Sequence, residues 1–210
     1  MNMTTNIPFL FTPLLTKLLF LLMSITFSSK SQMMINAANI SNNDTACRGS
    51  NALKYAKCLM KITFPKNSCD EVSTEIHARI QGEKEWIDPH NQGTYELDHK
   101  ELSSDKNLIY GSRRTGDGKY TDKFGFVLEP YISPTSKNHN GCEVEACSES
   151  QVFSILDFST NYCNLHSLYC NSEKGCTVVH QDLINYKEDY VNCWQNDVEK
   201  CFPARVSNAS

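Results

Sequence analysis

The chain has 210 residues, of which 10 are cysteine, and a formal net charge of −4. This length is enough for one ordinary domain with its own apolar core, and the cysteine content is about half the level that marks a pure disulfide scaffold. Acidic and basic residues are interleaved, which excludes the concentrated basic surface of a nucleic-acid-binding protein.

The N-terminus is typical of a secretory leader. Residues 9–27 are almost continuously apolar and small residues follow, so we expect a signal peptide at 1–31, with cleavage between 28 and 38. Removal of residues 1–38 takes away two lysines and no acid, which changes the net charge from −4 to −6. Because the apolar run is also about as long as a bilayer requires, a single-pass membrane anchor is the alternative, and membrane contact is expected only if the leader is uncleaved. Pro13 and Lys17 inside the run favour cleavage.

Three acceptor sequons for N-glycosylation begin at Asn39, Asn43 and Asn208. Together with the leader they divide the chain into a flexible, glycosylated N-terminus at 32–45, one disulfide-stapled domain at 46–203 and a tail at 204–210. These features predict a secreted, extracellular protein.

The cysteines form two groups around a long cysteine-free stretch. The first group is Cys47, Cys58 and Cys69, and the second is Cys142, Cys147, Cys163, Cys170, Cys176, Cys193 and Cys201. An even total after a secretory leader predicts disulfides. Since both groups hold an odd number, at least one disulfide must join them across residues 70–141, which the chain-entropy model values at roughly 4.4 kcal/mol. The pairing itself stays open.

The first predicted element is a helix at 46–62. Asp44 or Thr45 is available as a cap, apolar residues recur at spacings near 3.6, and Pro65 forbids continuation. On a helix Cys47 and Cys58 would lie about 16 Å apart along the axis, too far for a disulfide with each other.

The middle of the chain alternates apolar and polar residues. This pattern predicts strands at 74–81, at 94–97, from Leu108, and at 124–128 ending before Pro130, with a turn at 88–93. Asp117-Gly118 predicts a tight reversal between the last two strands. After a loop at 130–141, Ser148 to Gln151 has capping-box spacing before a helix, and 176–201 suggests a short strand and then a helix. The predicted fold is therefore α+β: an antiparallel sheet of about four strands, flanked by an N-terminal helix and a C-terminal cysteine-rich helical region and stapled by disulfides.

Motifs for enzyme chemistry are missing from the sequence: there is no serine-nucleophile elbow, zinc-protease helix, phosphate loop or dinucleotide fingerprint. The six histidines show no i, i+4 pair on a predicted helix, and His77 is expected to be solvated. Only Cys142 and Cys147 approach the spacing of zinc ligands, and no close second pair follows. We therefore identify no catalytic residue, no metal ligand and no cofactor.

Two surfaces suggest binding instead. The predicted hairpin tip carries Arg113, Arg114 and Lys119, with Lys123 nearby. These residues would suit a docking loop for an acidic partner or anionic polysaccharide, or a dibasic processing site, but a turn kept soluble by its charge is the preferred interpretation. A second set, Tyr162, Tyr169, Tyr186, Tyr190 and Trp194, could stack on sugar rings, but its spacing favours packing in a core.

Three segments resemble an uncharacterised group of secreted, cysteine-rich plant proteins: Gly116-Asp117-Gly118-Lys119-Tyr120-Thr121-Asp122-Lys123, Ala146-Cys147-Ser148-Glu149-Ser150-Gln151, and Phe158-Ser159-Thr160-Asn161-Tyr162-Cys163-Asn164-Leu165. The resemblance implies a plant extracellular location; it says nothing about activity, and no catalytic or binding residue is carried over from it.

Our first functional hypothesis is a non-enzymatic protein of the cell-wall space that binds a polysaccharide or another extracellular protein. The second is a secreted hydrolase with a dispersed site built from groups such as Asp157, His166 and His180. The third is an inhibitor or a peptide precursor cut at Arg113-Arg114.

Overall fold

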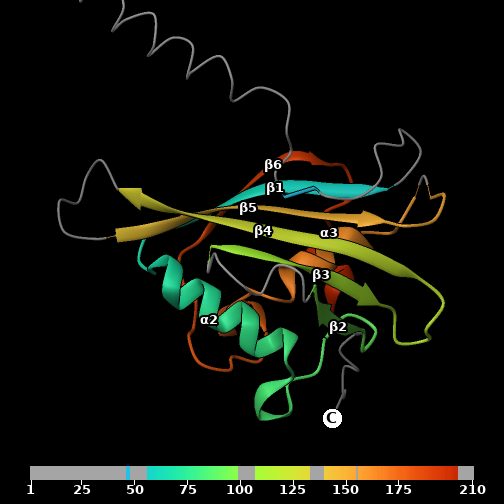
Figure 1. Cartoon of the computed structure of the whole chain (residues 1–210), viewed down its shortest axis with the longest axis horizontal. Coiled ribbons are helices and arrows are strands. Elements are labelled where there is room, and N and C mark those ends of the chain that lie inside the picture. Colours follow the sequence, from blue (N-terminus) through green and yellow to red (C-terminus); the bar gives the residue numbers. More distant parts are fainter. Residues whose placement is uncertain (1–45, 48–55, 99–106, 133–139, 155, 203–210) are drawn as a thin grey trace, which may run out of the picture. The chain divides into compact units, whose positions relative to one another are not determined.

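A computed structural model of the chain describes residues 46–47, 56–98, 107–132, 140–154 and 156–202, all within one compact unit, Asp44–Ser210. Its strands are β1 (Lys57–Phe64), β2 (Thr94–Leu97), β3 (Leu108–Arg114), β4 (Thr121–Ile132), β5 (Asn140–Ser150) and β6 (Lys187–Cys193). They form one antiparallel sheet in the order β2-β3-β4-β5-β1-β6 (Figure 1). The described ranges also contain two α-helices, α2 (Cys69–Ile80) and α3 (Thr160–His166), and the short 3-10 helices Glu83–Glu85, Ser172–Lys174 and Val198–Cys201.

The predicted helix at 46–62 is wrong over its described second half, because residues from Lys57 onward form β1. Cys58, Met60 and Ile62 alternate inward as in a strand, while Leu59 is buried on the opposite face against Ala46. The strand is buried on both faces only from Cys58 to Met60, and an apolar run of this kind does not show which period it has.

The predicted strand at 74–81 is also wrong, since these residues belong to α2. Ser68 caps the helix by accepting a hydrogen bond from the backbone N–H of Glu71, whose side chain accepts in return from the backbone of Ser68. This is a capping box. Val72, Ile76 and Ile80, at i, i+4 and i+8, face the core. The residues expected on a polar strand face include Glu75 and Arg79, which are both fully buried.

Glu75 and Arg79 can be buried because they pair with each other. The carboxylate of Glu75 lies 2.8 Å from the Arg79 guanidinium and also accepts the backbone N–H groups of Val179, His180 and Gln181. Burial alone would raise the pKa of Glu75, but these hydrogen bonds and Arg79 together lower it. The hydrogen bonds that Glu75 accepts therefore tie α2 to the chain segment before β6.

The strands predicted in the middle of the chain are confirmed at β2, β3 and β4, as is the reversal between β3 and β4, where Gly118 has φ +71°. β4 differs from prediction in running past Pro130 to Ile132. The backbone N–H of Leu128 points toward the β3 side, where it donates to the carbonyl of Asn107. By alternation the position of Pro130 points the same way, beyond the start of β3, so the sheet loses no hydrogen bond there.

The C-terminal third departs most from the prediction. The residues with capping-box spacing, Ser148 to Gln151, lie at the end of β5 and just beyond it. The helix in this region is α3, which begins only at Thr160. The predicted helix within 176–201 is the strand β6 followed by a 3-10 turn. The sheet thus has six strands instead of about four, and the predicted N-terminal helix and C-terminal helical region are both corrected.

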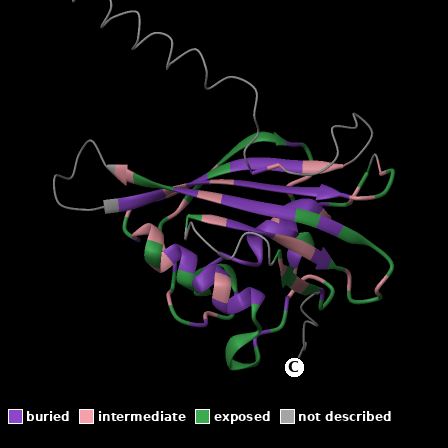
Figure 2. Ribbon diagram, in the orientation of Figure 1, coloured by how far each residue is buried: buried purple, intermediate pink, exposed green. Residues whose placement is uncertain are grey.

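The core lies between one face of the sheet and the two helices (Figure 2). Met60, Phe64, Phe126 and Val144 supply the sheet side, and Ile76 supplies part of the helix side; all five are fully buried. Tyr169 and Leu165 continue this core beneath β6.

The predicted disulfide framework is confirmed: all ten cysteines are paired. The pairs are Cys47–Cys147, Cys58–Cys193, Cys69–Cys142, Cys163–Cys201 and Cys170–Cys176. The first three join the two sequence groups, as the parity argument required of at least one disulfide. Five disulfides of this kind are typical of proteins of oxidising, extracellular compartments.

Candidate functional site

Exposed apolar side chains gather at one end of the molecule. Nine large apolar side chains are exposed in the described part of the chain, and eight of them belong to three segments that meet there. These eight, which we call the aromatic surface, are Tyr120, Val152, Phe153, Leu156, Phe158, Tyr190, Val191 and Trp194. The ninth, Ile87, lies elsewhere in the sequence and serves below as a control position.

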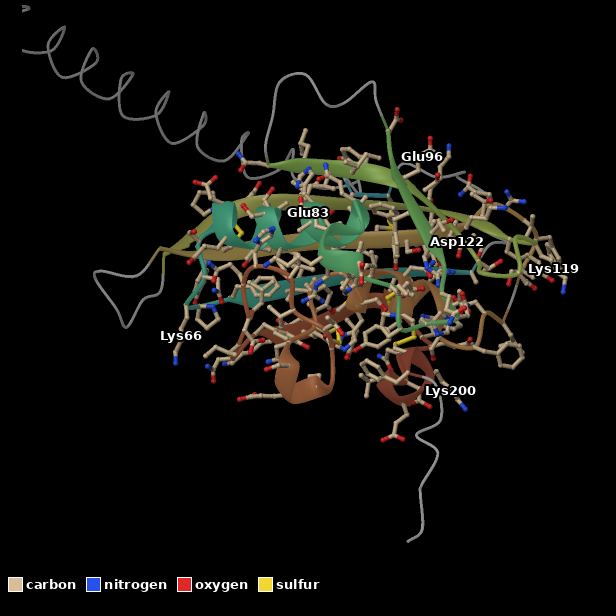
Figure 3. All side chains as sticks on the ribbon, turned by 90° about the horizontal axis from the view of Figure 1, so that it is seen from below. Lys66, Glu83, Glu96, Lys119, Asp122 and Lys200 are labelled. Carbon is tan, nitrogen blue, oxygen red and sulfur yellow. A yellow bond between two sulfur atoms is a disulfide. The ribbon has the colours of Figure 1, made fainter. Side chains whose placement is uncertain are left out.

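Sheet register brings the three segments together. β4 begins next to the end of β5, where Asp122 pairs with Ser150, and β6 ends next to the start of β1, where Cys193 pairs with Cys58. The hairpin tip before β4, the loop after β5 and the residues after β6 therefore leave the same end of the sheet. In Figure 3, Lys119 of the hairpin tip lies at this end and Lys66 at the opposite one.

The loop after β5 is held by hydrogen bonds. Oε1 of Gln195 accepts the backbone N–H groups of Asp157, at 3.0 Å, and Ser159, at 3.4 Å. The carboxylate of Asp157 caps α3 by accepting the N–H of Asn161 at 2.9 Å. The buried amide of Asn161 in turn donates to the carbonyl of Ala56 at 3.0 Å. Phe158 and Trp194 are thus exposed on backbone that is tied to the sheet.

The backbone of Phe158 is strained. Its φ is +52° and that of Ser159 is +69°, a region that bulky L-residues rarely adopt. The side chain is 75% exposed, so it gains no packing in the chain that would offset the strain. Strained residues of this kind cluster at functional sites.

Glu188 of β6 positions Tyr190 from below. Its Oε2 accepts the hydroxyls of Tyr190, at 2.7 Å, and Tyr162, at 3.0 Å, while Oε1 accepts the hydroxyl of Tyr169 at 2.6 Å and lies 3.1 Å from Nδ1 of His166. Burial alone would raise the pKa of Glu188, but His166 and the tyrosine hydroxyls lower it to about 2. Burial and the contact with Glu188 raise the pKa of Tyr190 to about 12.

β6 is the edge strand of the sheet and contains an irregularity at the aromatic surface. Leu59 and Met60 of β1 are opposite Asn192 and Tyr190, which leaves Val191 as an extra residue. A bulge increases the local twist and impedes strand addition at an edge. The irregularity therefore makes addition of a further strand at this edge unfavourable.

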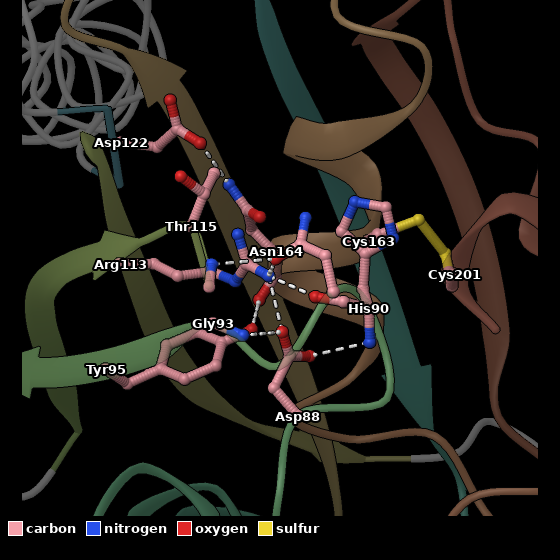
Figure 4. Close-up of polar contacts among 12 residues, drawn as sticks. Asp88, His90, Gly93, Tyr95, Arg113, Thr115, Asp122, Cys163, Asn164 and Cys201 are labelled. Atoms are coloured by element: carbon pink, nitrogen blue, oxygen red, sulfur yellow. Dashed lines mark hydrogen bonds and ion pairs between the residues drawn. A yellow bond between two sulfur atoms is a disulfide. The ribbon is translucent and has the colours of Figure 1, made fainter. Parts of the chain in front are cut away.

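The structure separates the residues of the predicted docking loop. Arg113 is fully buried: it pairs with Asp88, donates to Oδ1 of Asn91 at 2.9 Å and lies over the ring of Tyr95 (Figure 4). Arg114 and Lys119 are exposed, with Lys119 3.0 Å from Asp117. Of the three residues of the predicted docking loop, Arg114 and Lys119 are therefore the exposed ones, and they lie beside the aromatic surface.

The residues suggested for a dispersed hydrolase site have separate partners. Asp157 caps α3 and His166 contacts Glu188. Nε2 of His180 lies 2.7 Å from Glu83, which belongs to the 3-10 helix after α2. His77, expected to be solvated, is half-buried, with Nδ1 2.8 Å from the carbonyl of Ser73. The arrangement gives no nucleophile, base and orienting group in one hydrogen-bonded series.

The aromatic set noted in the sequence divides in two. Tyr162 and Tyr169 are buried and Tyr186 is partly buried, whereas Tyr190 is 46% and Trp194 91% exposed. Sequence reasoning missed Phe153, Leu156 and Phe158, because Ser148 to Gln151 was read as the start of a helix that would bury them. Their signal was a cluster of large apolar residues beside Ser154, Ser159 and Asp157, which are typical of loops.

Among the described residues, His166, Cys170 and Cys176 are the one group of three side chains close enough to hold a metal ion, with ligand atoms within 4.8 Å of one another. Both cysteines are used in a disulfide, so neither offers a thiolate. No helix of the described ranges is long and apolar enough to cross a membrane. The leader at 1–31, the segment 32–45, the sequons and the tail at 204–210 lie outside those ranges.

Comparison with known proteins finds no family model, no curated protein and no solved structure that matches this chain.

Proposed function

We propose that the chain is a non-enzymatic extracellular binding protein that docks another protein through its aromatic surface. The observation that carries this proposal is the gathering of eight of the nine exposed large apolar side chains of the described residues at one end of the sheet. Soluble monomers rarely expose apolar side chains in such concentration unless they are binding sites.

The residue types favour a protein partner. Trp, Tyr and Phe are enriched in the centres of protein interfaces, and Trp and Tyr carry much of their binding energy. The exposed charged residues Arg114, Lys119 and Asp197 near this end fit the polar rim that surrounds such a centre. The hydrogen bonds of Asp157 and Gln195 fix the loop before binding, which lowers the entropy lost on docking.

The five disulfides support an extracellular location. The resemblance to a group of secreted plant proteins is our reason for proposing the cell-wall space as the place of action. Cutting after Arg114 would release no peptide, because Cys47–Cys147 and Cys58–Cys193 join the two sides of that cut, so a binding protein is favoured over a peptide precursor.

The experiment is a comparison of three surface variants with the wild-type chain. A partner is recovered from extracellular fluid by chemical crosslinking and purified, and its affinity is measured by calorimetry. Phe158→Ser and Trp194→Ser should each weaken binding by about thirtyfold, as expected of hot-spot residues, whereas Ile87→Ser, at the remaining exposed apolar position, should leave it unchanged. Equal affinity of all four proteins would refute docking at this surface.

A further inference from the structure

The sheet has a cleft on the face turned away from α2 and α3. This cleft, of about 560 Å³, lies over β2, β3, β4 and β5, with Ala46 and Cys47 along one side. Its volume is within the range of small-molecule sites. None of its lining residues belongs to the aromatic surface.

The bottom of the cleft contains a row of polar side chains on neighbouring strands. Sheet register places Glu96 beside Ser112, Ser112 beside Lys123, and Lys123 beside Glu149. All four line the cleft. Carboxylates accept hydrogen bonds, the ammonium group donates them and the hydroxyl does both, so a ligand lying along the row meets donors and acceptors in alternation.

An apolar wall runs parallel to this row, one step along the strands. It consists of Tyr110, 5% exposed, and the disulfide Cys47–Cys147. Between them in the register is Gly125, where an added Cβ would lie 2.4 Å from the carbonyl oxygen of Ala46 and 2.7 Å from the ring of Tyr110. The absence of a side chain at Gly125 therefore lets the Ala46 backbone and the Tyr110 ring lie close to the sheet.

We propose that this cleft binds a short neutral saccharide. Sugar hydroxyls both donate and accept, which matches the alternating row. Glu96, Asp98 and Glu149 outnumber Lys123 among the charged lining residues, so an anionic sugar would meet net repulsion. The proposal goes beyond protein docking: a chain with both sites would bind a partner protein and a glycan at once.

The test is calorimetric titration of the disulfide-intact chain with neutral di- to hexasaccharides of glucose, xylose, mannose and galactose. Glu96→Gln and Lys123→Met change exposed residues at the cleft, and each should weaken saccharide binding by about tenfold through loss of a charge-assisted hydrogen bond. Lys61→Met and Glu143→Gln are matched controls, since this ion pair is on the same face of the sheet but outside the cleft. Both should bind like the wild type.

Three results would overturn the proposal: no neutral saccharide binds, binding survives both cleft substitutions, or oligogalacturonate binds more tightly than the neutral sugars. Phe158→Ser separates the two sites. It should weaken docking of the protein partner by about thirtyfold and leave the saccharide titration unchanged.

Discussion

Arg113 and Arg114 are neighbours in β3 whose side chains leave opposite faces of the sheet. Arg113 is fully buried against Asp88, while Arg114 is exposed and donates from Nε to the carbonyl of Gly118 at 3.0 Å. Two adjacent residues of the same type therefore have different roles, the first in stability and the second at the surface.

The two arginines should respond differently to the same substitution. Arg113→Gln leaves the carboxylate of Asp88 buried without its cation and should lower the free energy of unfolding by about 3–5 kcal/mol. Arg114→Gln should change it by less than about 0.5 kcal/mol. Urea unfolding with the disulfides intact measures both values, and similar losses in the two variants would contradict the assigned roles.

Glu188 makes the free energy of unfolding depend on pH. Its pKa is lowered from 4.5 to about 2 in the folded chain, so its contribution is complete above pH 4.5 and is lost as the pH falls toward 2. The shift corresponds to about 3 kcal/mol. Glu188→Gln should be less stable than the wild type at neutral pH and show a smaller loss of stability between pH 4.5 and 2, measured by thermal unfolding across this range. A pH dependence identical to that of the wild type would exclude Glu188 as its source.

The disulfides should differ in their contribution to stability. Cys58–Cys193 spans 135 residues and Cys170–Cys176 spans 6. In the chain-entropy model, replacing the first pair with serine costs about 5 kcal/mol and replacing the second costs about 2.4 kcal/mol. Urea midpoints of the two paired-serine variants test the order, which would be wrong if loss of the short disulfide cost as much as loss of the long one.

Phe158 should be a site where binding and stability conflict. Asn adopts positive φ more readily than Phe, and the left-handed conformation costs most residues about 1–2 kcal/mol. Phe158→Asn should therefore raise the free energy of unfolding by about 0.5–1 kcal/mol while weakening partner binding. Phe153→Asn is the control, because Phe153 is also exposed but has no positive φ; a similar gain in that variant would show that strain is not the cause.

The sequence was most informative where local chemistry decides the structure. Asp117-Gly118 marked the hairpin reversal, and the turn at 88–93 was recognised from its residue types before Asp88 proved to accept the N–H groups of His90 and Gly93. The parity of the cysteines required a long-range disulfide without any knowledge of the fold.

The spacing of apolar and polar residues predicted the wrong secondary structure where tertiary contacts decide which residues are buried. Glu75 and Arg79 look like the polar face of a strand, yet each makes burial of the other possible in α2. In β6, Glu188 lies between the exposed residues Lys187 and Asp189. Its burial is recognisable only when its partners Tyr162 of α3 and Tyr169 after α3 are known. For the same reason the aromatic surface could not be predicted, since it is assembled from three segments that only the sheet register brings together.

The overlapping disulfides have a consequence for proteolysis of the chain. Cys47–Cys147, Cys58–Cys193 and Cys163–Cys201 together span every peptide bond from Cys47 to Cys201. A protease that nicks the backbone once anywhere in this interval leaves a single covalent molecule, whose fragments separate on a gel only after reduction. Both candidate binding sites lie within the interval, so one accidental cleavage does not part them.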